Sequence, residues 1–293
     1  MCIQVSLKRC CLQGQREKAP ARRPKHPERR RYLQAANTIL SQASITSIFL
    51  SVPGLCNCRI CSFARLTNIM LLQHKTALNA KRVVLASGSK QRRELLSNMG
   101  VKFEILVSRF DEKLPKDRFP SGAEYALETA RHKALDVAAM VSEQQQQQHG
   151  PPVDLIISAD TVVEADGVIL EKPDDEEHAF QMISSLSGRD HQVHTGVSLV
   201  LPGEPDPSTG QPPFVRSFSV TTDVTFAKLS PETIRAYVAS GEPFGKAGSY
   251  GIQGPAGSFV VGLRGCFYNV VGFPLHRFCA EVLALVEEGR LKL

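Results

Sequence analysis

Apolar and polar residues follow regular periods from residue 81 to the C-terminus, and these periods predict alternating strands and helices. Short apolar runs and period-two alternation predict strands, whereas apolar residues three or four apart predict helices. This alternation is typical of a single α/β domain with a central mixed sheet flanked by helices. The predicted strands cover residues 82–86, 101–107, 155–157, 168–170, 193–201, 217–226, 259–263 and 266–271. The predicted helices lie within residues 89–100, 121–141, 174–188, 230–240 and 275–285.

The stretch 153–173 is the most informative part of this pattern. Its apolar run, Leu155–Ile157, is typical of a strand buried on both faces. Asp160 and Thr161 follow the run, at the carboxyl end of the predicted strand, where open α/β sheets place their ligands. Asp166-Gly167 then predicts a type I′ hairpin turn, and the returning strand leads to Lys172. We expect one hairpin to bring acidic side chains and a lysine together, although a solvated charged hairpin has the same pattern.

A second candidate site lies where the first predicted strand meets the first helix. Ser87-Gly88-Ser89 is a turn of small residues directly after the strand, and a helix begins next to it. Free backbone N–H groups at such a helix start bind phosphates. The helix start also carries three positive charges, on Lys90, Arg92 and Arg93. Positive charge at a helix N-terminus is unfavourable because of the helix dipole, and a bound anion would offset this repulsion. A solvated basic helix start fits the pattern equally well.

Other segments carry polar or glycine-rich patterns. Asp111 and Glu112 lie in a polar loop, and residues 144–148 form a glutamine run that we expect to be a surface loop. Residues 242–254 are rich in glycine, which indicates either close approach of the backbone to a ligand or a long turn. Arg264-Gly265 predicts the turn of a last hairpin that joins the final two predicted strands.

Charge separates residues 1–80 from the predicted domain, residues 81–293. The first segment contains thirteen Lys or Arg against two acids, so it carries +11 and the domain carries −5 of the total +6. A basic, proline-containing extension of this kind predicts disorder. The mildly acidic domain argues against nucleic-acid binding, which stays open only for the extension, as a salt-sensitive interaction.

The cysteines divide in the same way, with six in the extension and two, Cys266 and Cys279, in the domain. The domain therefore has no disulfide framework and fits a reducing compartment. Residues 56–61 superficially resemble a metal knuckle without a fourth ligand at zinc-like spacing, so unpaired thiols are favoured. The Arg-rich extension also permits a mitochondrial transit peptide, but we favour Met70 as a natural start. No apolar run is long enough to predict a membrane span.

Seven blocks of sequence between residue 81 and the C-terminus can be compared with known families. The blocks are LASGSKQRRELL at 85–96, SRFDEKL at 108–114, SADTVV at 158–163, EKP at 171–173, LSGRDHQVHTGV at 186–197, GEPFGKAGSYGIQG at 241–254 and NVVGFPL at 269–275. All of them, in this order, resemble blocks of the Maf family of nucleoside triphosphate pyrophosphatases. The resemblance implies a Maf/ITPase-like fold and is strongest to animal members that also carry a methyltransferase half.

The resemblance implies hydrolysis of a nucleoside triphosphate to the monophosphate and pyrophosphate, with a divalent cation, Mg²⁺ or Mn²⁺. It makes Asp160 the proton acceptor or metal-activating carboxylate, Glu112 a second carboxylate at the metal, and Lys172 a phosphate clamp. Thr161 and Gln253 match positions linked to base choice, and the segment around Gln253 matches the branch associated with dTTP and UTP. The implied substrate-binding residues are Ser87, Ser89, Gln91, Arg92, Thr161, Lys246 and Gln253.

Two positions depart from the family pattern. The family has Ser-Pro-Arg-Arg where this chain, aligned without a gap, has Ser89-Lys90-Gln91-Arg92, so a specificity arginine is replaced by glutamine. A slip of one residue would let Arg93 compensate. The acid that usually precedes the lysine of the glycine-rich loop is Gly245. The retained acid pair and lysine favour an active enzyme over a nucleotide-binding module that has lost turnover. Family likeness also implies a homodimer and a cytoplasmic location.

Overall fold

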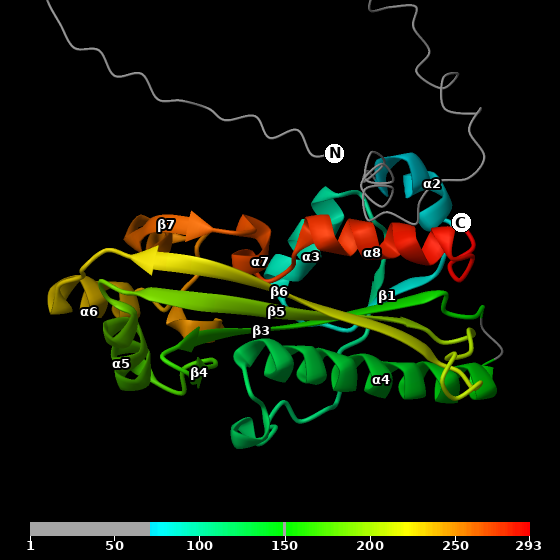
Figure 1. Ribbon diagram of the computed structural model, residues 1–293, viewed down its shortest axis with the longest axis horizontal. Coiled ribbons are helices and arrows are strands. Elements are labelled where there is room, and N and C mark those ends of the chain that lie inside the picture. The colour runs from blue at the N-terminus through cyan, green and yellow to red at the C-terminus, as the bar shows by residue number, and fades with distance from the viewer. Residues whose placement is uncertain (1–70, 149–150) are drawn as a thin grey trace, which may run out of the picture. The chain divides into compact units, whose positions relative to one another are not determined.

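The computed structural model describes residues 71–148 and 151–293, and in this part of the chain a seven-stranded mixed sheet lies between helices (Figure 1). The strand order is β2-β1-β3-β5-β6-β7, with β4 paired to β3. β1, β2 and β3 are parallel, and the other pairings are antiparallel. The strands are β1 (Val83–Leu85), β2 (Glu104–Ile105), β3 (Leu155–Ala165), β4 (Val168–Leu170), β5 (Asp190–Leu201), β6 (Phe214–Phe226) and β7 (Val260–Arg264).

The helices confirm the predicted fold class, an α/β domain with a central mixed sheet flanked by helices. None of the described helices is long and apolar enough to cross a membrane. The α-helices are α2 (Lys75–Leu78), α3 (Lys90–Asn98), α4 (Gly122–Gln148), α5 (Glu176–Leu186), α6 (Pro231–Ala239), α7 (Phe267–Val271) and α8 (Leu275–Glu287). Short 3₁₀ turns are η3 (Leu71–His74), η4 (Lys116–Arg118), η5 (Ala247–Ser249) and η6 (Pro255–Phe259).

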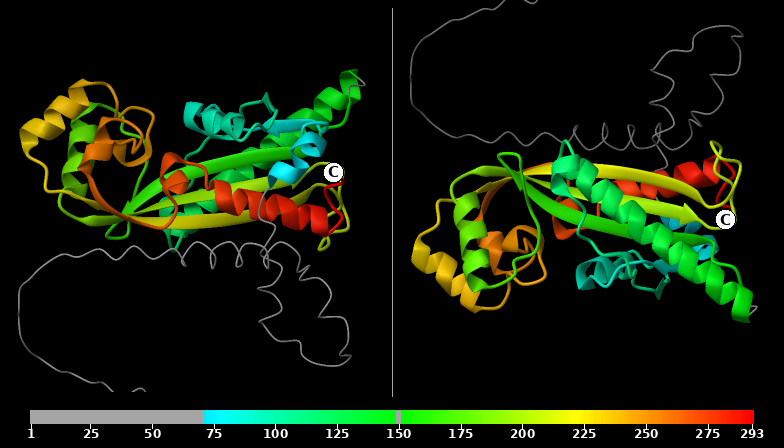
Figure 2. Two further views of the ribbon diagram at one scale, coloured as in Figure 1. Left: turned by 90° about the horizontal axis from the view of Figure 1, so that it is seen from above. Right: turned by 90° about the horizontal axis from the view of Figure 1, so that it is seen from below.

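Helices α3 and α8 pack on one face of the sheet, and α4 packs on the other (Figures 1 and 2). The residues of β3 alternate accordingly. Ile157 belongs to the core under α3 and α8, whereas Ile156 belongs to the core under α4. Because successive side chains of a strand point to opposite faces, Asp160 points toward α4 and Thr161 points toward α3, as their contacts show.

The close packing of α4 on the sheet depends on Gly196 of β5. A Cβ atom at this position would lie 2.4 Å from the backbone of Ala126 on α4. The helix presents small side chains there, since Ala126, Ala130 and Ala134 are fully buried. Gly196 is the direct partner of Asp160 in the β3–β5 register. The helix therefore crosses the sheet over the strand pair that carries Asp160, close enough for a side chain of α4 to reach it.

β3 is longer than the strands on its outer edge, and this leaves a gap in the sheet. β1 pairs with residues 155–157, and β4 pairs with residues 163–165. Between them, residues 158–162 have no partner strand on that edge within the described chain, while β5 covers the opposite edge. Asp160 lies in this gap. The prediction that the strand ends before Asp160 is wrong, because hydrogen bonds to β5 carry the strand on to residue 165.

Several local predictions are confirmed by backbone geometry. Asp166 and Gly167 have φ angles of 50° and 77°, as a type I′ turn requires. Asp175 caps α5 with its side chain. Ser230 caps α6, and Pro231 stands at the first position of that helix. Local turn and cap chemistry therefore places the ends of these elements correctly.

Two predicted elements differ in extent. Residues 144–148 continue α4 and are not a surface loop, because glutamine is a good helix former and no breaker precedes it. The strand predicted at residues 101–107 is only two residues long. Ile105 and Val107 are 46% and 54% exposed, because β2 lies at the edge of the described sheet and nothing covers their side chains.

The predicted last hairpin is wrong in its second half, since residues 267–271 form α7. Aromatic and β-branched residues there favoured a strand. Instead the Asn269 side chain donates to Val193 O at 2.9 Å and to Thr222 Oγ1 at 3.0 Å, which fixes one helical turn against the sheet. Gly272 then ends the helix in the left-handed region, with a φ of 115°. Tertiary hydrogen bonds have overridden local propensity.

The folded unit begins before the predicted boundary at residue 81. Leu71 and Leu78 are 5% and 1% exposed and belong to the core under α8. Residues 71–80 therefore pack with the domain. The predictions for residues 1–70, including disorder, the metal knuckle and the transit peptide, lie outside the described residues.

The buried histidine His191 predicts a pH dependence of stability. It is 3% exposed, and its Nε2 lies 2.8 Å from Tyr250 Oη. Burial lowers the pKa of His191 from 6.5 to about 4. Between these two pH values the unfolded chain binds a proton at His191 that the folded chain does not bind. The contribution of neutral His191 to stability is therefore fully present above pH 6.5 and is lost as the pH falls toward 4. We expect the free energy of unfolding to fall by roughly 3 kcal/mol across this window.

Urea unfolding at several pH values measures this loss. In His191→Gln the decrease should be much smaller, although some remains because burial also lowers the pKa of His194. The exposed His276 provides the control, and His276→Gln should follow the wild-type curve. An unchanged pH dependence in His191→Gln would show that another group causes the loss.

Candidate functional site

A cavity of about 570 Å³ opens at the gap in the edge of β3. Its walls come from segments that are far apart in the sequence: the turn after β1, the start of α3, the loop before α4, α4 itself, the middle of β3, the segment after β4, the glycine-rich loop and the end of α7. All predicted site residues lie around this one cavity. They are Ser87, Ser89, Gln91, Arg92, Glu112, Asp160, Thr161, Lys172, Lys246 and Gln253.

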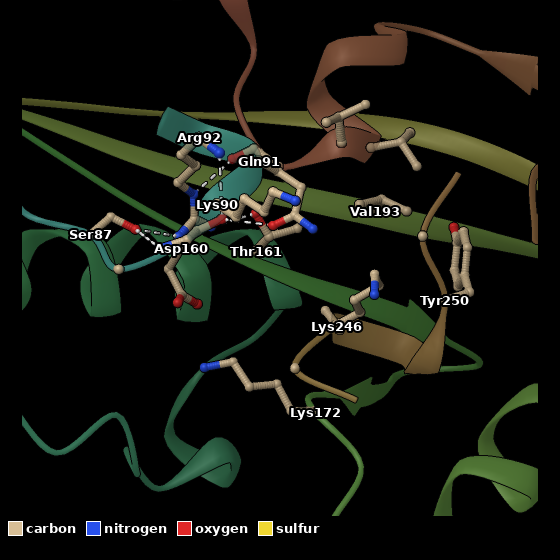
Figure 3. Close-up of a pocket in the computed structure, with 18 of the residues that line it drawn as sticks. Ser87, Lys90, Gln91, Arg92, Asp160, Thr161, Lys172, Val193, Lys246 and Tyr250 are labelled. Atoms are coloured by element: carbon tan, nitrogen blue, oxygen red, sulfur yellow. Dashed lines mark hydrogen bonds between the residues drawn. The ribbon is translucent and has the colours of Figure 1, made fainter. Parts of the chain in front are cut away.

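Figure 3 shows how the labelled side chains divide across the cavity. Ser87, Arg92 and Asp160 gather on one side, whereas Lys172 and Lys246 approach from the other. The first group comes from α3, the turn before it and β3, and the second from the end of β4 and the glycine-rich loop. A ligand in the cavity is therefore flanked by cations on both sides.

A buried lysine, Lys133 of α4, joins the two predicted catalytic carboxylates. Its Nζ lies 2.9 Å from Glu112 Oε1 and 3.2 Å from Asp160 Oδ1. Its side chain is only 8% exposed, and the glutamate also accepts a hydrogen bond from Lys172 Nζ at 3.0 Å. The acid pair is thus held between one buried and one exposed ammonium group.

Lys133 is not among the predicted site residues, although the sequence contains a signal for it. It lies between Ala130 and Ala134 on the predicted helix, and both alanines belong to the apolar stripe. A lysine adjoining such a stripe needs a buried anionic partner, because an unpaired buried charge is costly. An amphipathic pattern alone does not reveal this requirement.

The electrostatics of the acid pair give its members different properties. Burial raises the pKa of Asp160, and the charges of Lys133 and Arg92 oppose that rise. Burial also acts to raise the pKa of Glu112, but Lys133 and Lys172 outweigh it and hold the pKa at about 2. Glu112 is therefore a permanent anion, and Asp160 is the better proton acceptor of the two.

Arg92 organises the phosphate-binding side of the cavity. Its Nη1 donates to Ser87 Oγ at 3.1 Å, its Nη2 to Thr161 Oγ1 at 2.9 Å, and its Nε to Gly272 O at 2.9 Å. Burial lowers the pKa of Arg92, while Asp160 and Glu112 act in the opposite direction. Arg92 therefore fixes the turn after β1 against β3 and α7, beside the free N–H groups at the start of α3.

Burial distinguishes the two arginines of this motif. Arg92 is 9% exposed and lines the cavity, whereas Arg93 is exposed and does not. Arg92, and not Arg93, therefore lies at the cavity. Ser89 Oγ donates to Gln91 Oε1 at 3.2 Å, so the amide N–H groups of Gln91 are not used in this bond.

The glycine-rich loop holds Lys246 against Glu242. Lys246 Nζ donates to the carbonyl oxygen of Glu242 and lies 3.4 Å from its Oε1. Cβ atoms at Gly251 and Gly254 would lie 2.8 Å from Lys246 Cε and 2.5 Å from Glu242 Oε1, so a side chain at either position would displace the ends of these two side chains. Contact of Lys246 with a phosphate requires its side chain to turn away from Glu242.

The carboxylate pair fits a divalent cation that is completed by substrate oxygens. The described residues contain no cluster of three or more His, Cys, Asp or Glu side chains that could hold a metal alone. Mg²⁺ is commonly held by one or two carboxylates together with phosphate oxygens and water. Glu112 and Asp160 provide such a pair, which the cation has to share with Lys133.

These features define a class of protein: an α/β domain whose cavity gathers an acid pair, several cations and a helix N-terminus, groups that suit a phosphorylated ligand. The chain belongs to the Maf family, since the family model described as Maf-like protein matches residues 82–285. The resemblance predicted from the seven sequence blocks is confirmed.

Known relatives cover the same region. A human protein named probable bifunctional dTTP/UTP pyrophosphatase/methyltransferase protein is 47% identical over 205 residues, which are 70% of this chain and 32% of that protein. A dTTP/UTP pyrophosphatase from Clostridium perfringens is 42% identical over 197 residues, 67% of this chain and 93% of the relative. One from Vibrio cholerae is 42% identical over 199 residues, 68% of this chain and 95% of the relative. The chain thus spans about a third of the human relative.

Removing the charge of Lys133 should destabilise the fold. Lys133→Met keeps the apolar stem but leaves the buried Asp160 without its ammonium partner, so we expect the free energy of unfolding to fall by about 3 kcal/mol at neutral pH. Urea unfolding measures the change. Lys81→Met, which breaks a partly exposed 3.4 Å ion pair with Asp154, is the matched control and should cost less than about 1 kcal/mol. Equal losses in the two variants would contradict a special role for the buried lysine.

Proposed function

We propose that this protein is a metal-dependent nucleoside triphosphate pyrophosphatase that hydrolyses dTTP and UTP to the monophosphate and pyrophosphate. The observation that carries the proposal is the buried Lys133, which holds Glu112 and Asp160 side by side at the cavity. Relatives named dTTP/UTP pyrophosphatase, at 42% identity over most of their own length, support this activity. Modified pyrimidine triphosphates belong to the same proposed substrate class.

The proposed reaction begins with attack of water on the α-phosphorus. A bound Mg²⁺ or Mn²⁺ would supply a nucleophile at neutral pH by lowering the pKa of its water. Glu112 and Asp160 are the residues that would hold the cation. Burial raises the pKa of Asp160 against the opposing charge of Lys133, which suits this carboxylate to accept a proton from the attacking water. Glu112 keeps its negative charge throughout.

The leaving pyrophosphate needs positive charge close to its oxygens. Lys172 is 59% exposed, so its ammonium group can move from Glu112 to a phosphate oxygen. Lys246 can do the same by leaving Glu242. Arg92 stays in place and keeps Ser87 and the start of α3 ready for a phosphate oxygen. Together these groups stabilise the charge that develops on the leaving group.

We assign base choice to polar side chains of the cavity other than the acid pair and the lysines. Gln253 is exposed on the glycine-rich loop and lines the cavity. Its amide offers both a donor and an acceptor, which match the imide edge of thymine or uracil. Thr161 already bonds Arg92 and, at 3.0 Å, Thr195, so it is suited to orient the ligand. Gln91 brings unused amide N–H groups to a position where the family has an arginine.

A nucleotide-binding module that has lost turnover is the second candidate. Gly245 has a φ of 76° and no atom within 4 Å of a built Cβ, so the loop is open where the family has an acid. The intact contacts of Lys133 with Glu112 and Asp160 favour the enzyme. A homodimer and a cytoplasmic location, or a mitochondrial one if the extension is a transit peptide, stay predictions.

A nucleotide panel tests the proposed activity. The full chain is incubated with dTTP, UTP, dCTP, dATP and GTP, each with Mg²⁺, with Mn²⁺ or with EDTA, and released pyrophosphate is measured. We expect release from dTTP and UTP, dependence on the cation, and slower release from the other nucleotides. Saturable binding of dTTP without pyrophosphate release would favour the binding module instead.

Asp160→Asn should abolish turnover without unfolding the chain. Asparagine keeps the size of the side chain but cannot accept the proton, so we expect kcat for dTTP to fall by about 10³-fold. Circular dichroism checks the fold. Asp174→Asn removes a carboxylate that is 88% exposed and lies outside the cavity, and should retain wild-type kcat. A folded Asp160→Asn variant with wild-type kcat would remove the proposed proton acceptor.

A further inference from the structure

A buried hydroxyl group outside the cavity contacts two of the segments that line it. Tyr125, in the first turn of α4, is fully buried. Its Oη lies 3.0 Å from the carbonyl oxygen of Glu112 and 2.9 Å from Glu171 Oε1. Neither Tyr125 nor Glu171 lines the cavity, yet the hydroxyl group contacts the backbone of Glu112, and Glu171, which accepts its single proton, directly precedes Lys172.

Glu171 contacts three segments of the chain through hydrogen bonds and an ion pair. Its Oε1 accepts from Tyr125, and its Oε2 lies 2.6 Å from Lys116 Nζ, in the loop that follows Glu112. Its backbone carbonyl oxygen accepts from the Gly248 N–H at 3.0 Å, in the glycine-rich loop that carries Lys246. One residue therefore connects the Glu112 loop, the Lys172 segment and the glycine-rich loop.

The ring of Tyr125 cannot move easily from this position. It packs with Ala126 of α4 and Val162 of β3, and it meets Phe119 edge to face, with ring centroids 5.4 Å apart and an interplanar angle of 84°. Burial, followed by the neighbouring Glu171, raises the pKa of Tyr125, so the hydroxyl remains a donor at physiological pH. The carboxylate is the stronger of its two acceptors.

We propose that Tyr125 and Glu171 form a positioning pair that sets the distance between Glu112 and Lys172 for the reaction. This inference rests on the proposed pyrophosphatase activity. Glu112 and Lys172 lie on loops, and each has to be placed against the α-phosphorus and the leaving group. A displacement of about 1 Å at such groups can cost about 10²-fold in rate. The pair acts through Glu112 and Lys172 and does not itself touch the substrate.

Tyr125→Phe in the full chain is the first test. It keeps the ring packing and removes only the hydroxyl. We expect kcat for dTTP to fall about tenfold with a smaller change in KM, because Ser87 and Arg92 still bind the ground state. Tyr268→Phe removes the hydroxyl of a tyrosine that is 45% exposed and outside the cavity, and should leave both constants unchanged.

Variants of Glu171 separate positioning from simple packing. Glu171→Ala should lower kcat at least as much as Tyr125→Phe, whereas Glu171→Gln keeps an acceptor for the tyrosine and should recover part of the loss. The double variant Tyr125→Phe, Glu171→Ala should be no slower than the slower single variant, because both remove the same connection. A folded Tyr125→Phe protein with wild-type kcat, or fully additive losses, would overturn the proposal.

Hydrogen exchange provides a readout that does not need activity. In Tyr125→Phe, amides in residues 108–118 and 168–174 should exchange faster than in the wild type, while those in α8 should not. Unchanged exchange in both segments would overturn the positioning pair. If the wild type releases no pyrophosphate, the proposed function fails, and the exchange result still decides whether this pair holds the two loops.

Discussion

The burial of one ammonium group between two carboxylates is the constraint on which the site depends. Lys133 is 8% exposed, and an isolated charge at that depth would be costly. Its two anionic partners come from different parts of the chain, Glu112 from a loop and Asp160 from the middle of β3. Helix, loop and strand must therefore meet at hydrogen-bond distance, and Gly196 makes this approach possible by leaving space for the backbone of α4. The same packing that stabilises the domain also assembles its acid pair.

Sheet topology decides where this pair is accessible. β3 runs past the end of β1 and pairs with β4 only farther on, so one stretch of its outer edge has no partner strand among the described residues. The turn that contains Ser87 and the segment that contains Lys172 border this stretch, because they follow β1 and β4 directly. The glycine-rich loop then closes the cavity from the side of α6. A phosphate chain in this space would meet backbone N–H groups at one end and the ammonium groups of Lys172 and Lys246 at the other.

Much of this arrangement was predictable from the sequence, and the exceptions have physical causes. Asp160 and Lys172 follow from a buried apolar run and a type I′ turn, both of which are local signals. Lys133 was missed because its importance arises only when the helix packs on the sheet. The segment at 267–271 was taken for a strand because the aromatic side chains there favour one, whereas the bonds of Asn269 to β5 and β6 are long-range. The seven-block resemblance identified the family, but only burial established that Arg92, and not Arg93, enters the site.

The departures at Gln91 and Gly245 lie on the substrate side of the cavity and leave the acid pair intact, so they bear on base choice more than on chemistry. We propose that Glu112, Lys133 and Asp160 together direct water to the α-phosphorus. Hydrolysis of dTTP in ¹⁸O-labelled water, followed by mass spectrometry of both products, identifies the phosphorus that water attacks. We expect one labelled oxygen in dTMP and none in pyrophosphate. Label in pyrophosphate, or in released orthophosphate, would place the attack at another phosphorus and contradict it.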